Sequence, residues 1–87
     1  MKWHVYILRC SDGSLYTGVT TDLQRRIREH NETSRGAKYT RSRRPVTLCY
    51  SQEFPDRSSA QSEECRIKKL KRSLKLELIG ERSNVRK

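Results

Sequence analysis

Residues 3–20, WHVYILRCSDGSLYTGVT, predict a β-hairpin with one tyrosine in each strand. Polarity alternates along residues 3–9 in the two-residue period of a strand. The alternation assigns one face to Trp3, Val5 and Ile7 and the other to His4, Tyr6 and Leu8. An Asp-Gly pair at residues 12–13 favours a tight turn, and a second strand is expected over residues 15–20.

The turn decides whether Tyr6 and Tyr16 share a face of the hairpin. A two-residue turn puts them on opposite faces, because side chains alternate along each strand. A three-residue loop over residues 11–13, closed by a glycine in the left-handed conformation, puts Tyr6 opposite Gly18 and both tyrosines on one face. We expect this odd register, since only a shared face lets both hydroxyl groups act on one ligand.

Gly18 lies inside the second strand, where glycine is usually avoided. It indicates that another backbone or a ligand approaches the strand closely at this point. Either tyrosine taken alone is an ordinary residue of a half-buried strand. Their common hairpin and the neighbouring glycine together favour a functional pair.

The rest of the chain predicts one further strand and three helices. Helices are expected over residues 23–30, 58–71 and 74–79, and a strand over residues 46–52 with Val46, Leu48 and Tyr50 on one face. Thr21-Asp22 offers an N-cap to the first helix. A polar connection covers residues 31–45. The predicted fold is therefore α+β, a small three-stranded antiparallel sheet flanked by helices in the order β-β-α-β-α-α.

Domain boundaries follow from the end of this pattern. The 87 residues are enough for one domain, expected over residues 1–80. Gly80 is expected to end the last helix, because glycine favours the position after a helix C-terminus. Residues 81–87 are expected to form a flexible basic tail.

The charge of the chain points to a polyanionic partner. Twenty Lys+Arg against 10 Asp+Glu give a formal net charge of +10 and a pI near 10.1. Nucleic acid is the first expectation for such a domain, and a ribosome-associated or merely soluble basic protein explains the charge as well. No apolar stretch approaches the roughly 20 residues of a membrane span, so no membrane partner is expected.

Three cysteines, Cys10, Cys49 and Cys65, form no C-x-x-C pair. Their odd number and wide spacing favour buried free thiols over a disulfide or a metal site. The N-terminus, with Lys2, His4 and Arg9, does not resemble a signal peptide. We therefore expect a cytoplasmic protein, and association with the bacterial nucleoid is compatible with its charge.

Glu64 occupies an unusual position in the long helix. Ala60, Ile67, Leu70 and Leu74 recur at helical spacing and define an apolar stripe. Glu64 lies on or beside this stripe, whereas carboxylates are rarely buried unless they are paired or bind a metal. Two explanations remain open: an ion pair with a core-edge arginine such as Arg26, or a ligand for a divalent cation.

Arg26 and His30 project from one face of the first helix, since they are four residues apart. With the two tyrosine motifs and Glu64, they resemble the GIY-YIG nuclease family in order and spacing. The resemblance covers residues 3–79 and is closest to the short stand-alone bacterial members, which share the segments at residues 36–41 and 43–46. The N-terminal nuclease domain of the bacterial repair excinuclease is a more distant relative.

The resemblance implies a metal-dependent DNA endonuclease acting in DNA repair or processing, with single-stranded or branched DNA among its substrates. Glu64 then holds one Mg²⁺, or Mn²⁺ as the alternative, and Arg26 neutralises charge on the phosphate. Tyr6 or Tyr16 activates the attacking water while the other binds the phosphate, and Gly18 is structural. For His30 three roles are open: donation to the phosphate, proton transfer, or capping of the helix face.

The chain departs from the family pattern in two ways. The first motif, His4-Val5-Tyr6, lacks the glycine of the family name. Some relatives use an additional asparagine near the site, and neither Asn31 nor Asn84 is assigned to that role. The tyrosines and the second glycine remain, so the expected chemistry is retained.

The polar connection is expected to follow the nucleic-acid backbone. Its candidate contacts are Arg35, Lys38, Tyr39, Arg41, Arg43 and Arg44. Tyr39 can either stack on an unpaired base or pack over its own loop. An alternative function is a catalytically inactive nucleic-acid-binding module of the same fold. A structural protein with a basic surface explains the charge but leaves Glu64 unexplained.

Overall fold

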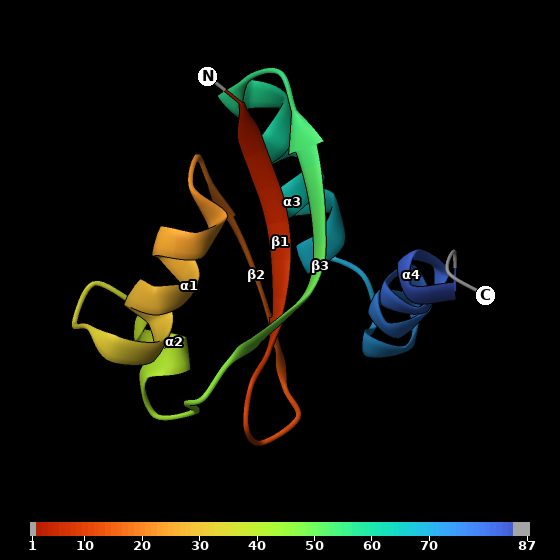
Figure 1. The fold of residues 1–87 in the computed structure, drawn as a ribbon. Coiled ribbons are helices and arrows are strands. Elements are labelled where there is room, and N and C mark those ends of the chain that lie inside the picture. The colour runs from red at the N-terminus through yellow and green to blue at the C-terminus, as the bar shows by residue number, and fades with distance from the viewer. Residues whose placement is uncertain (1, 85–87) are drawn as a thin grey trace.

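The computed structural model describes the backbone of residues 2–84 and the side chains of residues 2–80. A three-stranded antiparallel sheet lies at its centre, with strand order β2-β1-β3 and helices on both faces (Figure 1). The elements are β1 (Trp3–Arg9), β2 (Leu15–Thr20), α1 (Leu23–Glu32), α2 (Lys38–Arg41), β3 (Thr47–Phe54), α3 (Arg57–Lys68) and α4 (Arg72–Asn84). The predicted α+β class and order are confirmed, with the one-turn helix α2 added inside the polar connection.

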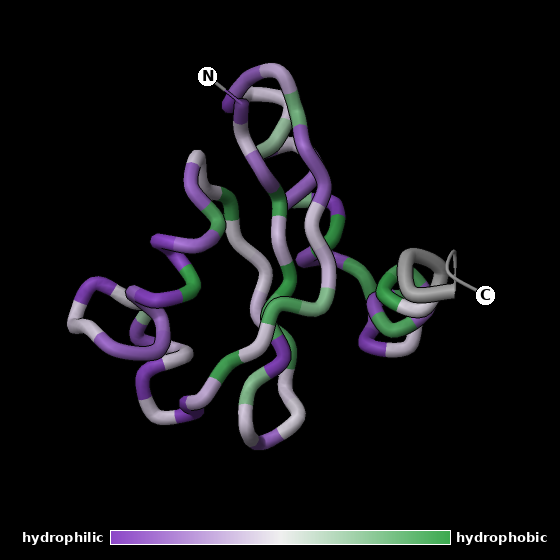
Figure 2. Tube along the Cα trace, in the orientation of Figure 1, coloured by the Kyte–Doolittle hydropathy of each residue, from purple (hydrophilic) through white to green (hydrophobic). Residues whose placement is uncertain are grey.

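The central strand β1 is buried on both faces, which divides the core into two clusters. Val5 and Ile7 pack with Tyr50 and with α3 and α4 residues, among them Ala60 and Ile67. On the opposite face lies a second cluster, formed by Tyr6, Leu8, Cys10 and Val46 with Tyr16, Leu23 and Ile27 packed against it. Because Val5 and Ile7 lie on one face and Tyr6 and Leu8 on the other, the predicted alternation along β1 is confirmed. The residues between α1 and β3, in contrast, are mostly hydrophilic (Figure 2).

The hairpin adopts the predicted odd register. Tyr6 pairs with Gly18, and Tyr16 pairs with Leu8. Cys10 N–H donates to Ser14 O at 2.9 Å, which leaves residues 11–13 as a three-residue loop. Gly13 closes the loop at φ +85°, a left-handed conformation that glycine adopts without steric cost. The two tyrosines consequently lie on the same face of the sheet.

The third strand contains a bulge that its sequence pattern does not reveal. Ile7 pairs with Tyr50 while Leu8 pairs with Leu48, so Cys49 is the extra residue. The bulge reverses the alternation, and the prediction that Val46, Leu48 and Tyr50 share a face is wrong. Val46 belongs to the cluster around Tyr6, Tyr50 belongs to the opposite cluster, and Leu48 is 36% exposed.

The two C-terminal helices differ from their predicted limits. The helix expected over residues 58–71 ends at Lys68, and α4 begins at Arg72. The chain therefore leaves the axis of α3 before Leu74, which is 44% exposed and not part of the buried stripe.

Gly80 does not end the last helix, because α4 continues to Asn84. Glycine inside a helix costs only about 1 kcal/mol relative to alanine, so it weakens a helix without stopping it. Residues 85–87 of the predicted tail lie outside the described residues.

All three cysteines are free thiols, as predicted, but their predicted burial is wrong for Cys65. Cys10 is buried, Cys49 is half-buried and Cys65 is exposed. Within the described residues, no helix is both long and apolar enough to cross a membrane.

Two apolar side chains of the predicted stripe, Ile67 and Leu74, provide a test of the fold. Ile67→Ala removes a fully buried side chain, and we expect it to lower the free energy of unfolding by about 2–5 kcal/mol. Leu74→Ala, at a position 44% exposed, is the control and should change it by less than about 1 kcal/mol. Urea unfolding followed by circular dichroism measures both, and equal effects would contradict the assignment of Leu74 to the surface.

Candidate active site

Three aromatic rings meet on the face of the sheet covered by α1. The Tyr6 and Tyr16 ring centroids are 6.5 Å apart, and the His30 ring lies 5.9 Å from Tyr6 and 5.2 Å from Tyr16. Tyr6 and His30 are almost completely buried, whereas Tyr16 is half-buried. The structure therefore brings together the two predicted tyrosines and the predicted histidine.

Gly18 makes room for Tyr6. A Cβ atom at Gly18 would lie 2.5 Å from Tyr6 Oη and 2.7 Å from Tyr6 Cζ. The tyrosine side chain thus crosses the neighbouring strand at the one position without a side chain. The close approach predicted for Gly18 is present, and the approaching group is the cross-strand tyrosine itself.

His30 joins Tyr6 to the polar connection through both ring nitrogens. Its Nε2 lies 2.9 Å from Tyr6 Oη, and its Nδ1 lies 2.9 Å from Thr40 Oγ1. The Ala37 backbone N–H donates to Nδ1 at 3.3 Å. The Thr40 hydroxyl in turn donates to Ala37 O at 2.9 Å. The imidazole therefore links the Tyr6 hydroxyl to Thr40 and to the backbone of the connection, and its tautomer decides which ring nitrogen donates.

The polar connection packs directly on α1 to make these contacts. A Cβ atom at Gly36 would lie 2.7 Å from both Glu29 O and His30 Cα, so only glycine permits this approach. The next residue, Ala37, then presents its amide to the imidazole. One turn further along, α2 places buried Thr40 beside the same ring.

Burial sets the protonation of the two central groups. It lowers the pKa of His30 to about 4, with the nearby Arg26 charge acting in the same direction, so the imidazole is neutral at pH 7. Burial also raises the pKa of Tyr6 to about 12, against a lowering by its hydrogen bond to Arg26. At neutral pH the isolated protein therefore holds Tyr6 as the phenol.

Arg26 is fixed by acceptors from its own helix and from the connection. Its Nη1 donates to Glu29 Oε1 at 2.9 Å and to Arg35 O at 2.8 Å. The side chain is 26% exposed, so part of the guanidinium remains accessible.

The predicted N-cap of α1 is confirmed, because Asp22 accepts from Arg25 N–H at 3.1 Å.

Glu64 lies on α3 with its side chain 20% exposed, and Lys68 Nζ is 3.0 Å from its Oε2. Its charge acts on Tyr6, where it adds to the rise in pKa. One explanation considered for Glu64 is an ion pair with Arg26. Among the described side chains Arg26 pairs with Glu29 instead.

A divalent cation is compatible with this donor set. Within the described residues, no group of three or more His, Cys, Asp or Glu side chains could enclose a metal. One carboxylate suits Mg²⁺, which keeps several waters and takes further ligands from phosphate. The carboxylate already accepts one cation, the Lys68 ammonium.

The cations of the polar connection have different environments. Arg35, Lys38 and Arg41 are exposed. Arg44 instead binds the C-terminal end of α1, donating to His30 O at 2.6 Å and to Thr33 O. Its geometry favours a structural role over nucleic-acid contact.

Tyr39 packs over its own part of the fold. Its ring stacks on Tyr16 with centroids 5.9 Å apart and planes 28° apart, and Arg43 Cζ lies 4.1 Å from the Tyr39 centroid. Arg43 also pairs with Asp12 at 3.1 Å, which ties the connection to the hairpin loop. Tyr39 is nevertheless 40% exposed, so its outer edge remains accessible.

Sequence reasoning missed three residues that organise this site. Glu29 accepts a hydrogen bond from Arg26, and Thr40 is hydrogen-bonded to His30. Asn31 fixes the chain just before β3, because its side-chain amide exchanges two hydrogen bonds with the Val46 backbone. Glu29 lies three residues after Arg26, a spacing that could have indicated the ion pair. Nothing in the polar connection singled out Thr40.

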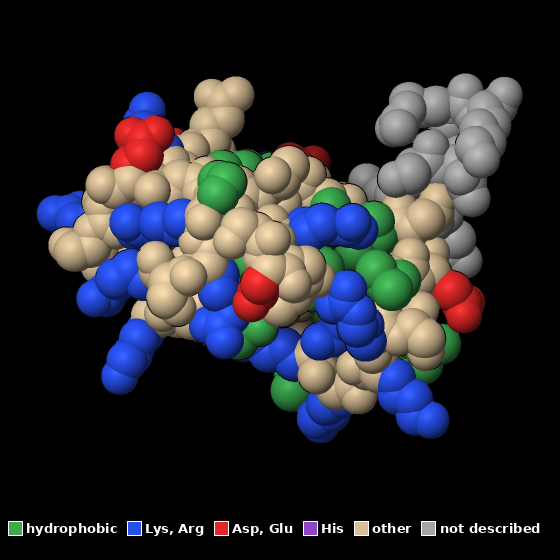
Figure 3. Space-filling model, turned by 90° about the horizontal axis from the view of Figure 1, so that it is seen from below, with side chains coloured by type: hydrophobic (Ala, Val, Ile, Leu, Met, Phe, Trp, Pro, Cys, Tyr) green, Lys and Arg blue, Asp and Glu red, His purple; other side chains and the backbone are tan. Residues whose placement is uncertain are grey.

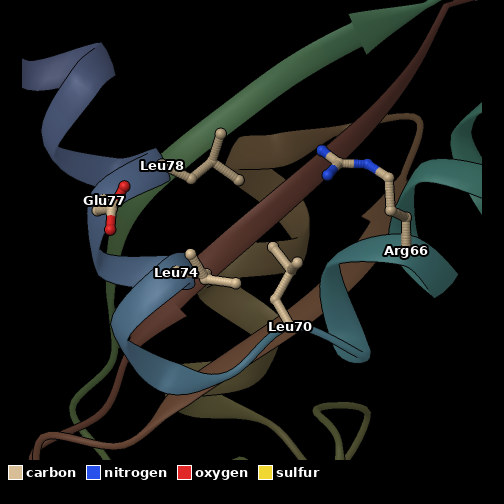
Figure 4. A pocket seen from close by; sticks show the side chains of 5 residues that line it. All are labelled: Arg66, Leu70, Leu74, Glu77 and Leu78. Atoms are coloured by element: carbon tan, nitrogen blue, oxygen red, sulfur yellow. The ribbon is translucent and has the colours of Figure 1, made fainter.

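An apolar groove lies elsewhere on the molecule, between α3 and α4. Its lining residues are Arg66, Leu70, Leu74, Glu77 and Leu78 (Figure 4). Leu78 packs against the core cluster on the face opposite Tyr6. The groove is therefore separate from the tyrosine site.

Comparisons with known proteins return one family model and several similar proteins. A family model described as the GIY-YIG catalytic domain matches residues 2–77. A UPF0213 protein of Desulfotalea psychrophila is 53% identical over 77 residues, covering 88% of this chain and 70% of that protein. A UPF0213 protein of Streptococcus sanguinis is 51% identical over 82 residues, covering 94% and 93%.

Solved structures give the same result. The solution NMR structure of a protein from E. faecalis matches with a TM-score of 0.64 at 43% identity, covering 92% of this chain and 84% of that chain. The solution NMR structure of a UPF0213 protein from Bacillus halodurans matches with a TM-score of 0.60 at 46% identity, with the same coverage of both chains.

The contact between Gly18 and Tyr6 can be tested by a double-mutant cycle. Gly18→Ala should lower the free energy of unfolding by about 1–3 kcal/mol, because the added methyl group overlaps the tyrosine ring. In a Tyr6→Leu background the same change should cost clearly less. Gly80→Ala, in an open helical position, is the control and should be neutral or slightly stabilising. Additive effects at residues 6 and 18 would refute the contact.

The neutral state of His30 predicts a pH dependence of stability. Because folding lowers the pKa of His30 from 6.5 to about 4, the unfolded chain binds more protons between these values. Stability is therefore lost as pH falls through this window, by about 2 kcal/mol from pH 7 to pH 5. Urea unfolding should show this loss in the wild type and in the control His4→Gln, and much less of it in His30→Gln. An NMR titration of the His30 ring with a midpoint near 6.5 would contradict the assignment.

Proposed function

The chain belongs to the GIY-YIG family, and from this we propose that it is a metal-dependent DNA endonuclease that hydrolyses phosphodiester bonds. The observation that carries the proposal is the hydrogen-bonded group of Tyr6, His30 and Arg26 on one face of the sheet. It combines a hydroxyl group, a neutral imidazole donor and a fixed guanidinium within one site. Such a group suits attack of water on a phosphate, where negative charge develops on oxygen.

Arg26 is the proposed phosphate ligand. A guanidinium carries five N–H donors in a planar fork, which fits two oxygens of a phosphate. Glu29 and Arg35 O engage Nη1 and hold the group in place. Donors on the accessible edge remain for a substrate, so the arginine enters the reaction already oriented.

Tyr6 is proposed to activate the attacking water, and Tyr16 to bind the phosphate. Arg26 is a hydrogen-bond donor to the Tyr6 oxygen, and His30 is a second donor when its proton is on Nε2, so both groups would favour the phenolate. His30 is proposed to orient Tyr6, because its Nε2 lies 2.9 Å from the Tyr6 hydroxyl group. Tyr16 is half-buried and lies beside the same ring cluster.

Glu64 would hold the divalent cation, Mg²⁺ or Mn²⁺, which when bound supplies positive charge that neutralises the phosphate and favours the phenolate. The Lys68 ammonium is the partner that the carboxylate gives up on loading. Gly18 keeps its structural role by admitting the Tyr6 ring.

One observation favours a second candidate, the inactive nucleic-acid-binding module. In the isolated protein the Glu64 carboxylate is already neutralised by Lys68 at 3.0 Å. A module that had lost its metal would keep such a pair, together with the fold and the basic surface. Binding of DNA without cleavage distinguishes this candidate from the enzyme.

The decisive test is cleavage of labelled single-stranded, duplex and branched DNA with Mg²⁺ or with a chelator. We expect Mg²⁺-dependent cleavage that falls by about 10²–10³-fold in Tyr6→Phe and in Glu64→Gln. Glu63→Gln is the matched control, because Glu63 is the adjacent carboxylate and pairs with exposed Arg66 instead. Its rate should stay within about twofold of the wild type.

Three results would count against this proposal. Cleavage at the wild-type rate in Glu64→Gln would show that this carboxylate is not required. Cleavage in the presence of chelator would show that no metal is required. Tight binding of all three substrates without cleavage would establish the inactive module in its place.

A further inference from the structure

The junction between α3 and α4 carries a second group of cations, which we call the junction cations: Lys69, Lys71, Arg72 and Lys75. Lys69, Lys71 and Arg72 are exposed and Lys75 is half-buried. None of the ion pairs formed by the described side chains involves any of the four. Four cations without an acidic partner repel one another unless a polyanion neutralises them.

The apolar residues of this segment explain why the cations face outward. Leu70, Leu74 and Leu78 follow at intervals of four residues and line the groove between α3 and α4 (Figure 4). Lys75 follows Leu74 on α4 and so points about 100° away around that helix, whereas Lys71 lies in the link between the two helices and is exposed there. Leu78 and Ile79 also anchor α4 to the core, so its apolar side is occupied by the domain.

Contacts at the hairpin loop connect the junction cations to the basic polar connection. Arg72 Nη2 donates to Gly13 O at 2.9 Å, and Arg43 Nε pairs with Asp12 at 3.1 Å. The loop is therefore held between one arginine from each basic segment. Seen from below, lysine and arginine side chains extend across the molecule on both sides of this loop (Figure 3).

We propose that the junction cations bind the phosphate backbone of the DNA outside the cleaved position, so that the substrate crosses the hairpin loop. This inference rests on the proposed function and extends its substrate-binding surface from residues 35–44 to residues 69–75. The Cα trace of the domain extends 31 Å along its longest axis. At 3.4 Å per base pair, that length corresponds to about nine base pairs of duplex.

The test is the salt dependence of DNA binding in chelator, which needs no cleavage. Fluorescence anisotropy with a 20-base-pair duplex gives Kd between about 50 and 200 mM salt for Lys71→Gln/Lys75→Gln. The slope of log Kd against log salt should fall by about 1–2, and Kd at low salt should rise about tenfold. Arg72 is left intact because it holds the hairpin loop.

Lys2→Gln/Arg57→Gln is the matched control, since it removes the same net charge. Lys2 pairs with Glu53, and Arg57 lies over the Trp3 ring at the other end of β1 from the loop. The control should change the slope by less than half as much. Equal slopes in the two double variants, or an unchanged slope in the junction variant, would overturn the proposal. So would a junction variant that loses binding to phosphatidylserine vesicles and keeps its affinity for duplex.

Cleavage assays separate this inference from the proposed function. In an active enzyme the junction variant should raise KM and leave kcat within about twofold, because the changed residues lie outside the tyrosine site. If the wild type binds DNA without cleaving it and the slope still falls, the endonuclease proposal fails and the binding surface stands. If cleavage is normal and the slope does not fall, the surface is refuted and the endonuclease stands.

Discussion

The fit of Tyr6 across Gly18 is the constraint on which the rest of the structure depends. A cross-strand glycine is needed because any side chain there would overlap the tyrosine ring. The pairing of Tyr6 with Gly18 in turn requires the three-residue hairpin loop closed by Gly13. Once the ring is in place, its hydroxyl group meets His30, which fixes α1 and the polar connection over the same face. Turn, strand register and candidate chemistry are thus consequences of one steric fit.

The hairpin and its faces could be predicted from sequence because both depend on local rules. Alternation along β1 and the chemistry of the Asp12-Gly13 turn act over a few residues and admit few alternatives. The bulge at Cys49 arises when β3 pairs with a strand more than 40 residues away, so no local pattern reports it. At Gly80 a local rule gave a wrong prediction. Glycine is favoured after helix ends, but α4 continues through this residue to Asn84.

The candidate site was predictable to the same extent. Tyr6, Tyr16, Arg26 and His30 belong to local motifs, and the structure brings them together. The residues that orient them come from contacts distant in sequence, such as Thr40 with the imidazole. Arginines illustrate the limit most clearly, because sequence gives them equal charge. In the fold, Arg44 holds the end of α1, Arg43 holds the hairpin loop, and Arg26 faces the tyrosine.

The protonation state of the isolated protein bears on how such a site can work. Burial raises the pKa of Tyr6 to about 12, and the Glu64 charge adds to the rise. The same burial keeps His30 neutral, so it can donate to a phenolate but supplies no charge to form one. Arg26 alone does not offset these effects. A divalent cation held by Glu64 would outweigh the single negative charge of that carboxylate, so the pair would lower the pKa of Tyr6 where Glu64 alone raises it. Under the proposed function, the tyrosine therefore stays a phenol until a cation is bound, which confines the reactive form to the loaded complex.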